Sequence, residues 1–127
     1  MEPKRHSFEK VKAWAEARKF RKIIYELSKK FPREELFCLT SQIRRAAISV
    51  HSNIAEGYGR YNFQENLQLC RTARGSLNEV LDQLYVAWDE KYISQNEFKH
   101  TYEKGQSLEY DINCYIRFLK KQKTNYN

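Results

Sequence analysis

Long apolar runs, glycine and proline are all scarce in this sequence. It contains no segment of about 18 consecutive apolar residues, which excludes a conventional membrane-spanning helix. With only four glycines and two prolines, the sequence has few points at which a helix must end. No segment long enough to form a strand alternates apolar and polar residues with the period of two that a half-buried strand requires. The N-terminal residues MEPKRHSFEK contain no apolar segment, so we expect no secretory leader.

Cysteine is scarce as well, and the usual catalytic and metal-binding patterns are missing. The cysteines are odd in number, widely spaced and without a C-x-x-C pattern, so we expect free thiols in the reducing cytoplasm: Cys38, Cys70 and Cys114. No metal-ligand spacing includes the histidines, which are His6, His51 and His100. No glycine pattern matches a phosphate-binding loop. We therefore expect no catalytic residue, no metal, no cofactor and no enzymatic activity.

Basic residues are concentrated in the first quarter of the chain. Residues 1–33 hold 11 Lys or Arg and 4 Asp or Glu, whereas residues 34–127 hold 12 of each. The whole formal charge of +7 therefore arises in the N-terminal quarter. A small basic protein suggests a nucleic acid as one partner, and a merely solvated basic surface is the alternative.

Apolar residues recur with the helical period in four segments. The pattern predicts a basic first helix over about 7–30, a second over about 40–56, a third over about 62–91 and a fourth that starts near residue 94. Residues 32–38 fit either a short turn or the start of the second helix. The polar tail, about 120–127, is expected to fray.

Residues that typically begin or end helices support these boundaries. Pro32 ends the first helix, and Gly57 with Gly59 is expected to end the second in the left-handed conformation. Capping boxes begin the third helix at Asn62 and the fourth at Ser94. Four amphipathic helices with short connections predict one domain over residues 1–127, an all-α up-down-up-down antiparallel four-helix bundle.

The segment SQIRRAAISVHSNIAEGYGR, residues 41–60, places an amide and an acid near a predicted helix end. Asn53 and Glu56, if buried, need partners, and the candidates include Arg60, Arg71, Arg74 and Ser76. One interpretation is a structural polar cluster that fixes the turn between helices two and three: Asn53, Glu56, Arg60 and Ser76. The other is a ligand or oligomer contact. A mid-helix glycine beside Ser76, Gly75, suggests a close helix contact.

One row of basic residues on the first helix has no acid within it. The candidate phosphate-binding residues are Arg18, Arg21, Lys22 and Lys29, with Tyr25 among them. By contrast, Lys12, Lys19 and Lys30 have acidic neighbours at helical spacing. Solubility is the alternative role of the uncompensated row. The aromatic residues fall mostly on core stripes, so we do not expect them to stack on bases.

The segments LTSQIRRAAISVHSNIAEGYGR (39–60) and ARGSLNEVLDQL (73–84) carry a family resemblance. Together with Trp14 and KKFPREEL (29–36), they resemble the four-helix bundle proteins encoded by intervening sequences in bacterial large-subunit ribosomal RNA genes. Cys38 departs from the glycine expected before LTSQIRR, so the start of the second helix is open to variation. The resemblance covers nearly the whole chain.

The resemblance implies a function without implying a catalytic residue. The same fold family includes the accessory variability determinants of diversity-generating retroelements, which resemble basic homopentameric barrels that bind nucleic acid and a reverse transcriptase. The resemblance implies a homo-oligomer, which could be a pentamer. It also implies binding of RNA or DNA with little sequence specificity, as an accessory to a reverse transcriptase or an rRNA-associated element. The alternative is a protein–protein adaptor that docks an acidic partner through its basic helix.

Overall fold

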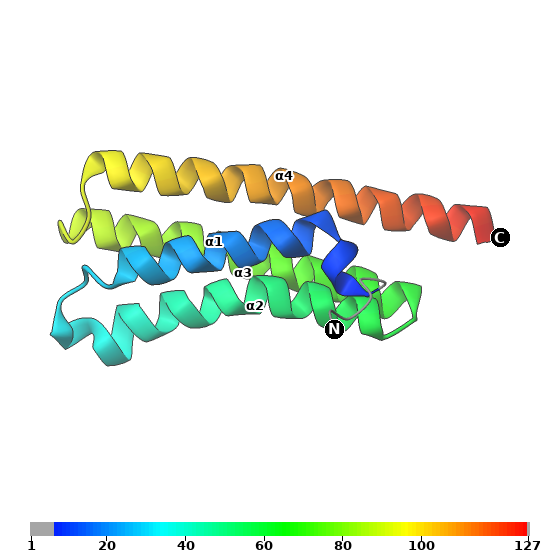
Figure 1. Ribbon diagram of the computed structural model, residues 1–127, viewed down its shortest axis with the longest axis horizontal. Coiled ribbons are helices and arrows are strands. Elements are labelled where there is room, and N and C mark those ends of the chain that lie inside the picture. The colour runs from blue at the N-terminus through cyan, green and yellow to red at the C-terminus, as the bar shows by residue number, and fades with distance from the viewer. Residues whose placement is uncertain (1–6, 127) are drawn as a thin grey trace, which may run out of the picture.

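Four long helices make up the computed structural model, which describes residues 7–126 and their side chains as far as residue 123. They are α1 (Lys12–Ser28), α2 (Ser41–Gly59), α3 (Phe63–Asp89) and α4 (Gln95–Tyr126). Successive helices run in opposite directions (Figure 1), and each packs against two neighbours, so that α4 closes the ring against α1. Residues 7–126 contain no strand. The all-α, up-down-up-down antiparallel bundle predicted from the sequence is confirmed.

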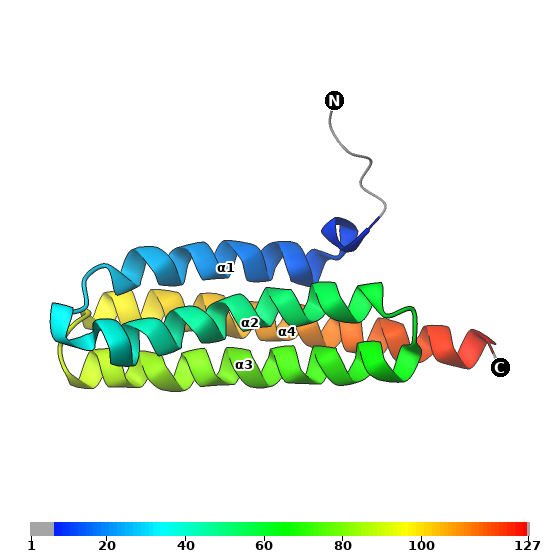
Figure 2. The same ribbon diagram turned by 90° about the horizontal axis from the view of Figure 1, so that it is seen from below.

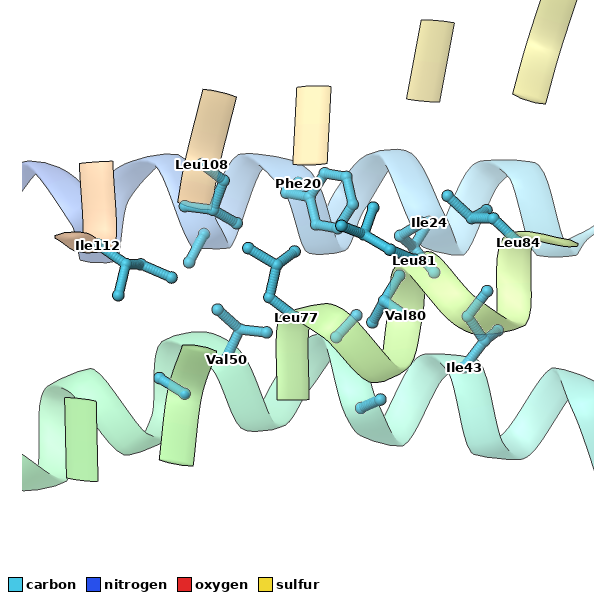
Figure 3. Packing of buried hydrophobic residues seen from close by; sticks show 14 of the residues in the cluster. Phe20, Ile24, Ile43, Val50, Leu77, Val80, Leu81, Leu84, Leu108 and Ile112 are labelled. Atoms are coloured by element: carbon cyan, nitrogen blue, oxygen red, sulfur yellow. The ribbon is translucent and has the colours of Figure 1, made fainter. Parts of the chain in front are cut away.

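The apolar stripes of all four helices meet in a single core (Figure 3). Ile24 of α1, Val50 of α2, Leu77 of α3 and Ile112 of α4 are all fully buried. Each such side chain contributes about 1.5–3 kcal/mol through removal from water. The core therefore holds the helix faces in fixed rotations, and these rotations decide which polar side chains share a surface.

Capping side chains begin the third and fourth helices as predicted. The backbone N–H of Ser94 donates to the Glu97 carboxylate, and the N–H of Glu97 donates to Ser94 Oγ, which completes a reciprocal capping box. At the start of α3, the N–H of Glu65 donates to Asn62 Oδ1 at 3.0 Å. These three bonds satisfy backbone donors that the first turn of a helix leaves free.

The predicted first helix, 7–30, is shorter and interrupted. Val11 has an extended backbone (φ −79°, ψ 116°), which separates a 3-10 turn, Phe8–Lys10, from α1. The reason is packing of the turn back onto the helix, since the ring centroids of Phe8 and Trp14 lie 4.9 Å apart. The other end of α1 is Ser28.

The connection from α1 to α2 is helical but irregular. A 3-10 turn, Arg33–Glu35, leads into one turn of π-helix, Leu36–Thr40, which contains Cys38 and joins α2 directly. The Glu35 carboxylate accepts hydrogen bonds from the N–H of Leu39 and from the hydroxyl of Tyr92. This segment therefore extends the second helical region at its start, which the sequence pattern left undecided.

Two predicted helix ends are wrong. In the described residues no glycine has a positive φ, and α2 passes through Gly57 to Gly59; the left-handed residue that follows α2 is Tyr61, with φ of 53°. Gly57 serves close packing instead, because Asn66 of α3 lies against it. At the C-terminus, α4 continues to Tyr126, past residue 120, where the sequence predicted the end of the regular helix.

Candidate nucleic-acid interface

Two of the predicted phosphate-binding residues lie on the side of α1 that faces α2. The Arg18 guanidinium lies 5.9 Å from the centroid of the Trp14 ring, and that of Arg21 lies 5.4 Å from the Tyr25 ring. Both distances are within the range of a cation–π contact. Such contacts restrain long side chains without neutralising them, so both charges stay available to an anion.

Arg44 of α2 joins these two residues, and the sequence pattern did not single it out. Its guanidinium lies 4.9 Å from the Tyr25 ring centroid, and its Nε donates to Ser28 Oγ at 2.7 Å. Tyr25 thus holds one arginine from each of two helices. We call Arg18, Arg21 and Arg44 the arginine cluster. Its sequence signal is the pair Arg44-Arg45, which only a known helix rotation would have assigned to this face.

His51 of α2 lies beside the same cluster. Its ring makes an edge contact with Trp14, with 6.5 Å between centroids, and its Nε2 is buried without a hydrogen-bond partner. Burial lowers the pKa of His51 below 6.5, and the positive charges of Arg21 and Arg18 lower it further. The neutral form is therefore favoured, and the arginines supply the positive charge of this surface.

Lys22 lies on another side of α1 from the arginine cluster, whereas Lys29 borders a hollow with Arg44 but is paired with an acid. Lys22 borders a shallow hollow between α1 and α4, together with His100 and Thr101. Lys29 Nζ lies 2.9 Å from the Glu26 carboxylate in an exposed ion pair, so the prediction that its row lacks a compensating acid is wrong. The row seen in sequence therefore does not act as one uncompensated surface, because Lys22 borders α4 and Lys29 pairs with Glu26.

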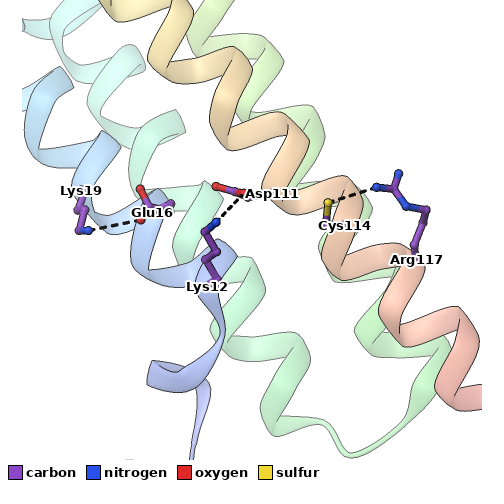
Figure 4. Close-up of polar contacts among 6 residues, drawn as sticks. All are labelled: Lys12, Glu16, Lys19, Asp111, Cys114 and Arg117. Carbon is purple, nitrogen blue, oxygen red and sulfur yellow. Dashed lines mark hydrogen bonds and ion pairs between the residues drawn. The ribbon is translucent and has the colours of Figure 1, made fainter.

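The lysines that the sequence assigned acidic neighbours do have them. Lys19 pairs with Glu16 at 3.4 Å, and Lys12 pairs with Asp111 of α4 at 3.6 Å (Figure 4). Lys30 pairs with Glu97, also of α4. Two of the three partners thus come from another helix and not from α1 itself. These three lysines form a matched control for the arginine cluster.

The predicted polar cluster separates into two parts. The hydroxyls of Ser49 and Ser76 are hydrogen bonded at 2.8 Å across the α2–α3 contact, and the Asn53 amide donates to the Ser49 hydroxyl and carbonyl oxygens. Glu56 and Arg60 instead form an ion pair at 2.6 Å with about half of each side chain exposed. Asn53 and Ser76 thus belong to a structural contact, whereas Glu56 and Arg60 lie one helical row away at the surface.

The small residues of α2 and α3 are used within the chain. Ala46, Ala47 and Ala73 are buried where the two helices pack. Gly75, which suggested a close contact, has no atom within 4 Å of the position its Cβ would occupy, so that inference is wrong. The small-residue faces therefore explain the tight α2–α3 packing and do not by themselves supply a surface for self-association.

The described residues include neither a group of side chains suited to a metal ion nor a helix suited to span a membrane. Residues 7–126 contain no group of three His, Cys, Asp or Glu side chains placed to hold a metal ion. In that same span, none of the helices combines the length and apolarity needed to cross a membrane.

Helix order, core and surface together define the class: an antiparallel four-helix bundle with an arginine cluster between its first two helices. Residues 9–113 match the family described as 23S rRNA-intervening sequence protein. The match spans most of the chain, and the protein belongs to this family. The resemblance found in the sequence is thereby confirmed.

A solved structure shares the fold. It is the crystal structure of a protein of unknown function from the S23 ribosomal protein family of Bacteroides thetaiotaomicron, with a TM-score of 0.76 and 19% sequence identity. The similarity covers 83% of this chain and 95% of that one. At this identity the likeness establishes the fold alone. No curated protein matches the sequence.

Proposed function

We propose that this protein is a non-enzymatic, cytoplasmic, homo-oligomeric bundle that binds RNA or DNA with little sequence preference. The observation that carries the proposal is the arginine cluster, in which Arg21 and Arg44 from two helices share the Tyr25 ring and Arg18 lies on the Trp14 ring. Arginine suits phosphate because its planar donors match the geometry of the oxygens. In the described part of the chain, none of these three arginines forms an ion pair with an acid, so each is open to a phosphate.

Low sequence preference follows from the kind of contact. Phosphates are identical along a strand, so contacts to them position a protein without reading bases. The three free thiols fit a reducing compartment, which supports the cytoplasmic assignment. The family match supports an association with an rRNA element, and an accessory role beside a reverse transcriptase is the other context that we propose.

Self-association is supported by exposed apolar residues at the start of the second helical region. Phe37 is 88% exposed and Leu36 is 45% exposed, both in the π-turn before α2. Exposed large apolar side chains that adjoin one another mark contact surfaces more often than isolated ones do. A pentamer, the state implied by the related retroelement proteins, would present the arginine cluster five times.

A salt titration of binding tests the proposal. Replacing Arg18, Arg21 and Arg44 with Gln should weaken binding to a random-sequence duplex and reduce the slope of log K against log salt by roughly 0.7–0.9 for each lost contact. Replacing Lys12, Lys19 and Lys30 with Gln removes the same charge from paired sites and should change the slope less. A melting curve of each variant confirms that it folds, because Arg44 also bonds Ser28.

Comparison of the arginine and lysine variants has two outcomes that would contradict the proposal. Equal weakening in both triple variants would mean that bulk charge drives binding and that the arginine cluster has no special role. Unchanged binding in both would reject the arginine cluster as the nucleic-acid contact and favour the adaptor with an acidic protein partner.

A further inference from the structure

Aromatic rings line a hollow at the end of the bundle where α2 turns into α3. Its volume is about 800 Å³, within the range of small-ligand sites. The turn and α3 contribute Tyr61 and Phe63, and α4 contributes Tyr115 and Phe118. The hollow lies where α4 runs past the turn between α2 and α3, while the Phe8–Lys10 turn bends away from the start of α1 (Figure 2). The arginine cluster contributes no residue to it.

The aromatic ring of Tyr115, on the inner wall of this hollow, is held in place by its neighbours. Burial raises the pKa of the Tyr115 phenol, and a hydrogen bond from Asn66 partly offsets that rise. Asn66 Oδ1 also accepts a weak hydrogen bond from Cys70 Sγ at 3.6 Å, which fixes the amide. The Phe118 ring is nearly parallel to that of Tyr115, at 19° and 6.4 Å between centroids. The hollow therefore has preorganised flat walls.

Tyr61, at the rim, combines two unfavourable features. Its backbone is left-handed, with φ of 53°, and its side chain is 91% exposed. Glycine or asparagine is the ordinary choice for such a position after a helix, since a side chain there costs about 1 kcal/mol. An exposed ring on a strained backbone gains nothing for folding, and strain of this kind is typical of binding sites.

Lys123 is the cation among the residues that line the hollow, and other basic residues lie on the same stretch of α4. The last 14 residues contain four Lys or Arg and no Asp or Glu, a local excess that the balanced count over residues 34–127 conceals: Arg117, Lys120, Lys121 and Lys123. Lys123 Nζ lies 4.9 Å from the centroid of the Phe63 ring, within the hollow. Arg117, one turn before Lys120 and Lys121, is anchored by donating to Cys114 Sγ at 3.2 Å (Figure 4). Flat apolar walls beside the Lys123 cation suit a ligand that combines a planar ring with an anion.

We infer that this hollow receives an unpaired base of single-stranded RNA or DNA, with an adjacent phosphate on Lys123 of α4. Bases inside a duplex are already stacked and paired, so only an unpaired base can enter. The inference rests on the proposed function and adds to it a preference for single strands. It assigns the arginine cluster to phosphates of any nucleic acid and the hollow to the base.

Tyr61→Gly gives a sharp test because it removes the ring while relieving the backbone strain. The variant should melt at or above the wild-type temperature, yet bind short single-stranded oligothymidylate about 5-fold to about 150-fold more weakly, the range for loss of one stacked base. Duplex affinity should stay unchanged. Tyr61→Phe keeps the ring and should bind like wild type, and Tyr110→Ala removes an exposed ring of α4 outside the hollow as a matched control.

A fluorescent base provides the second readout. An oligothymidylate with one 2-aminopurine should lose fluorescence on binding wild type, because stacking quenches this base, and should keep it on binding Tyr61→Gly or Phe118→Ala. If both variants quench the probe and bind single strands like wild type, the base site is wrong. Equal weakening of single strand and duplex also overturns it. In either case, loss of duplex binding on replacement of the arginine cluster would leave the proposed function standing.

Discussion

Gly57 of α2 lies directly against Asn66 of α3. A Cβ added at residue 57 would lie 2.6 Å from Asn66 Oδ1 and 3.2 Å from its backbone oxygen. The same asparagine bonds both Cys70 and Tyr115, so this contact links helix packing to the aromatic hollow. Space at residue 57, not backbone freedom, is therefore the reason for the glycine.

The first prediction compares two helical glycines. Gly57→Ala should destabilise the fold by about 1–2 kcal/mol, because the backbone of Asn66 must shift and the cost of overpacking exceeds the helix-propensity gain. Gly75→Ala is the control, since nothing lies within 4 Å of its added Cβ, and it should stabilise the fold by about 0.5–1 kcal/mol. Urea unfolding measures both. The two substitutions should change the free energy of unfolding in opposite directions. A change in the same direction would contradict the packing role of Gly57.

The second prediction concerns the Ser49–Asn53–Ser76 contact. Asn53→Leu should cost about 1–3 kcal/mol, since it removes the amide that donates to Ser49 in a partly buried site. Glu56→Ala, only one turn away, should leave the melting temperature essentially unchanged because its ion pair is half exposed. If Asn53→Leu melts like wild type, the hydrogen-bonded contact between α2 and α3 carries no net stability.

The third prediction concerns pH. The pKa of His51 is lowered in the folded state, first by burial and then by Arg21 and Arg18, so the unfolded state binds the proton more readily. Stability should be complete above the unfolded pKa of 6.5 and should decline as the pH falls through the lowered folded value. Thermal melts across this range measure the decline.

A variant without the two arginine charges provides the control for His51. Replacing Arg18 and Arg21 with Gln should raise the pKa of His51, read by NMR titration of its ring, and narrow the acid-induced loss of stability. Burial alone would remain as the cause of the shift. An unchanged pKa would mean that the arginines lie too far from His51, or are too well solvated, to influence it.

The fourth prediction concerns self-association through the π-turn. Wild type should scatter light as a multiple of its 15.3 kDa chain at micromolar concentration. Phe37→Ser should reduce the mass or raise the concentration needed for assembly, because it removes an exposed apolar ring. Tyr110→Ser, an equally simple change of an exposed ring on α4, should not. A monomeric wild type would remove the homo-oligomer from the proposed function.

Local chemistry determined the helices and their order. Four stretches of apolar residues recur with the helical period, and the capping side chains of Asn62 and Ser94 mark two starts. These signals depend on contacts within one or two turns of the same segment, which is why the sequence reveals them. The errors fall where packing overrides local preference, as at Val11, which interrupts the first helix, and at Gly57, which lies inside the second.

Only the tertiary structure decided which cations share a surface. Arg18, Lys22 and Lys29 form one row on an isolated helix, but Lys22 borders α4, Lys29 pairs with Glu26, and Arg44 from α2 completes the cluster. The aromatic hollow likewise joins Tyr61 with Phe118, which are far apart in the sequence. The physical reason is that the rotation and offset of each helix come from the fit of buried side chains across the whole core, and no local pattern contains that fit.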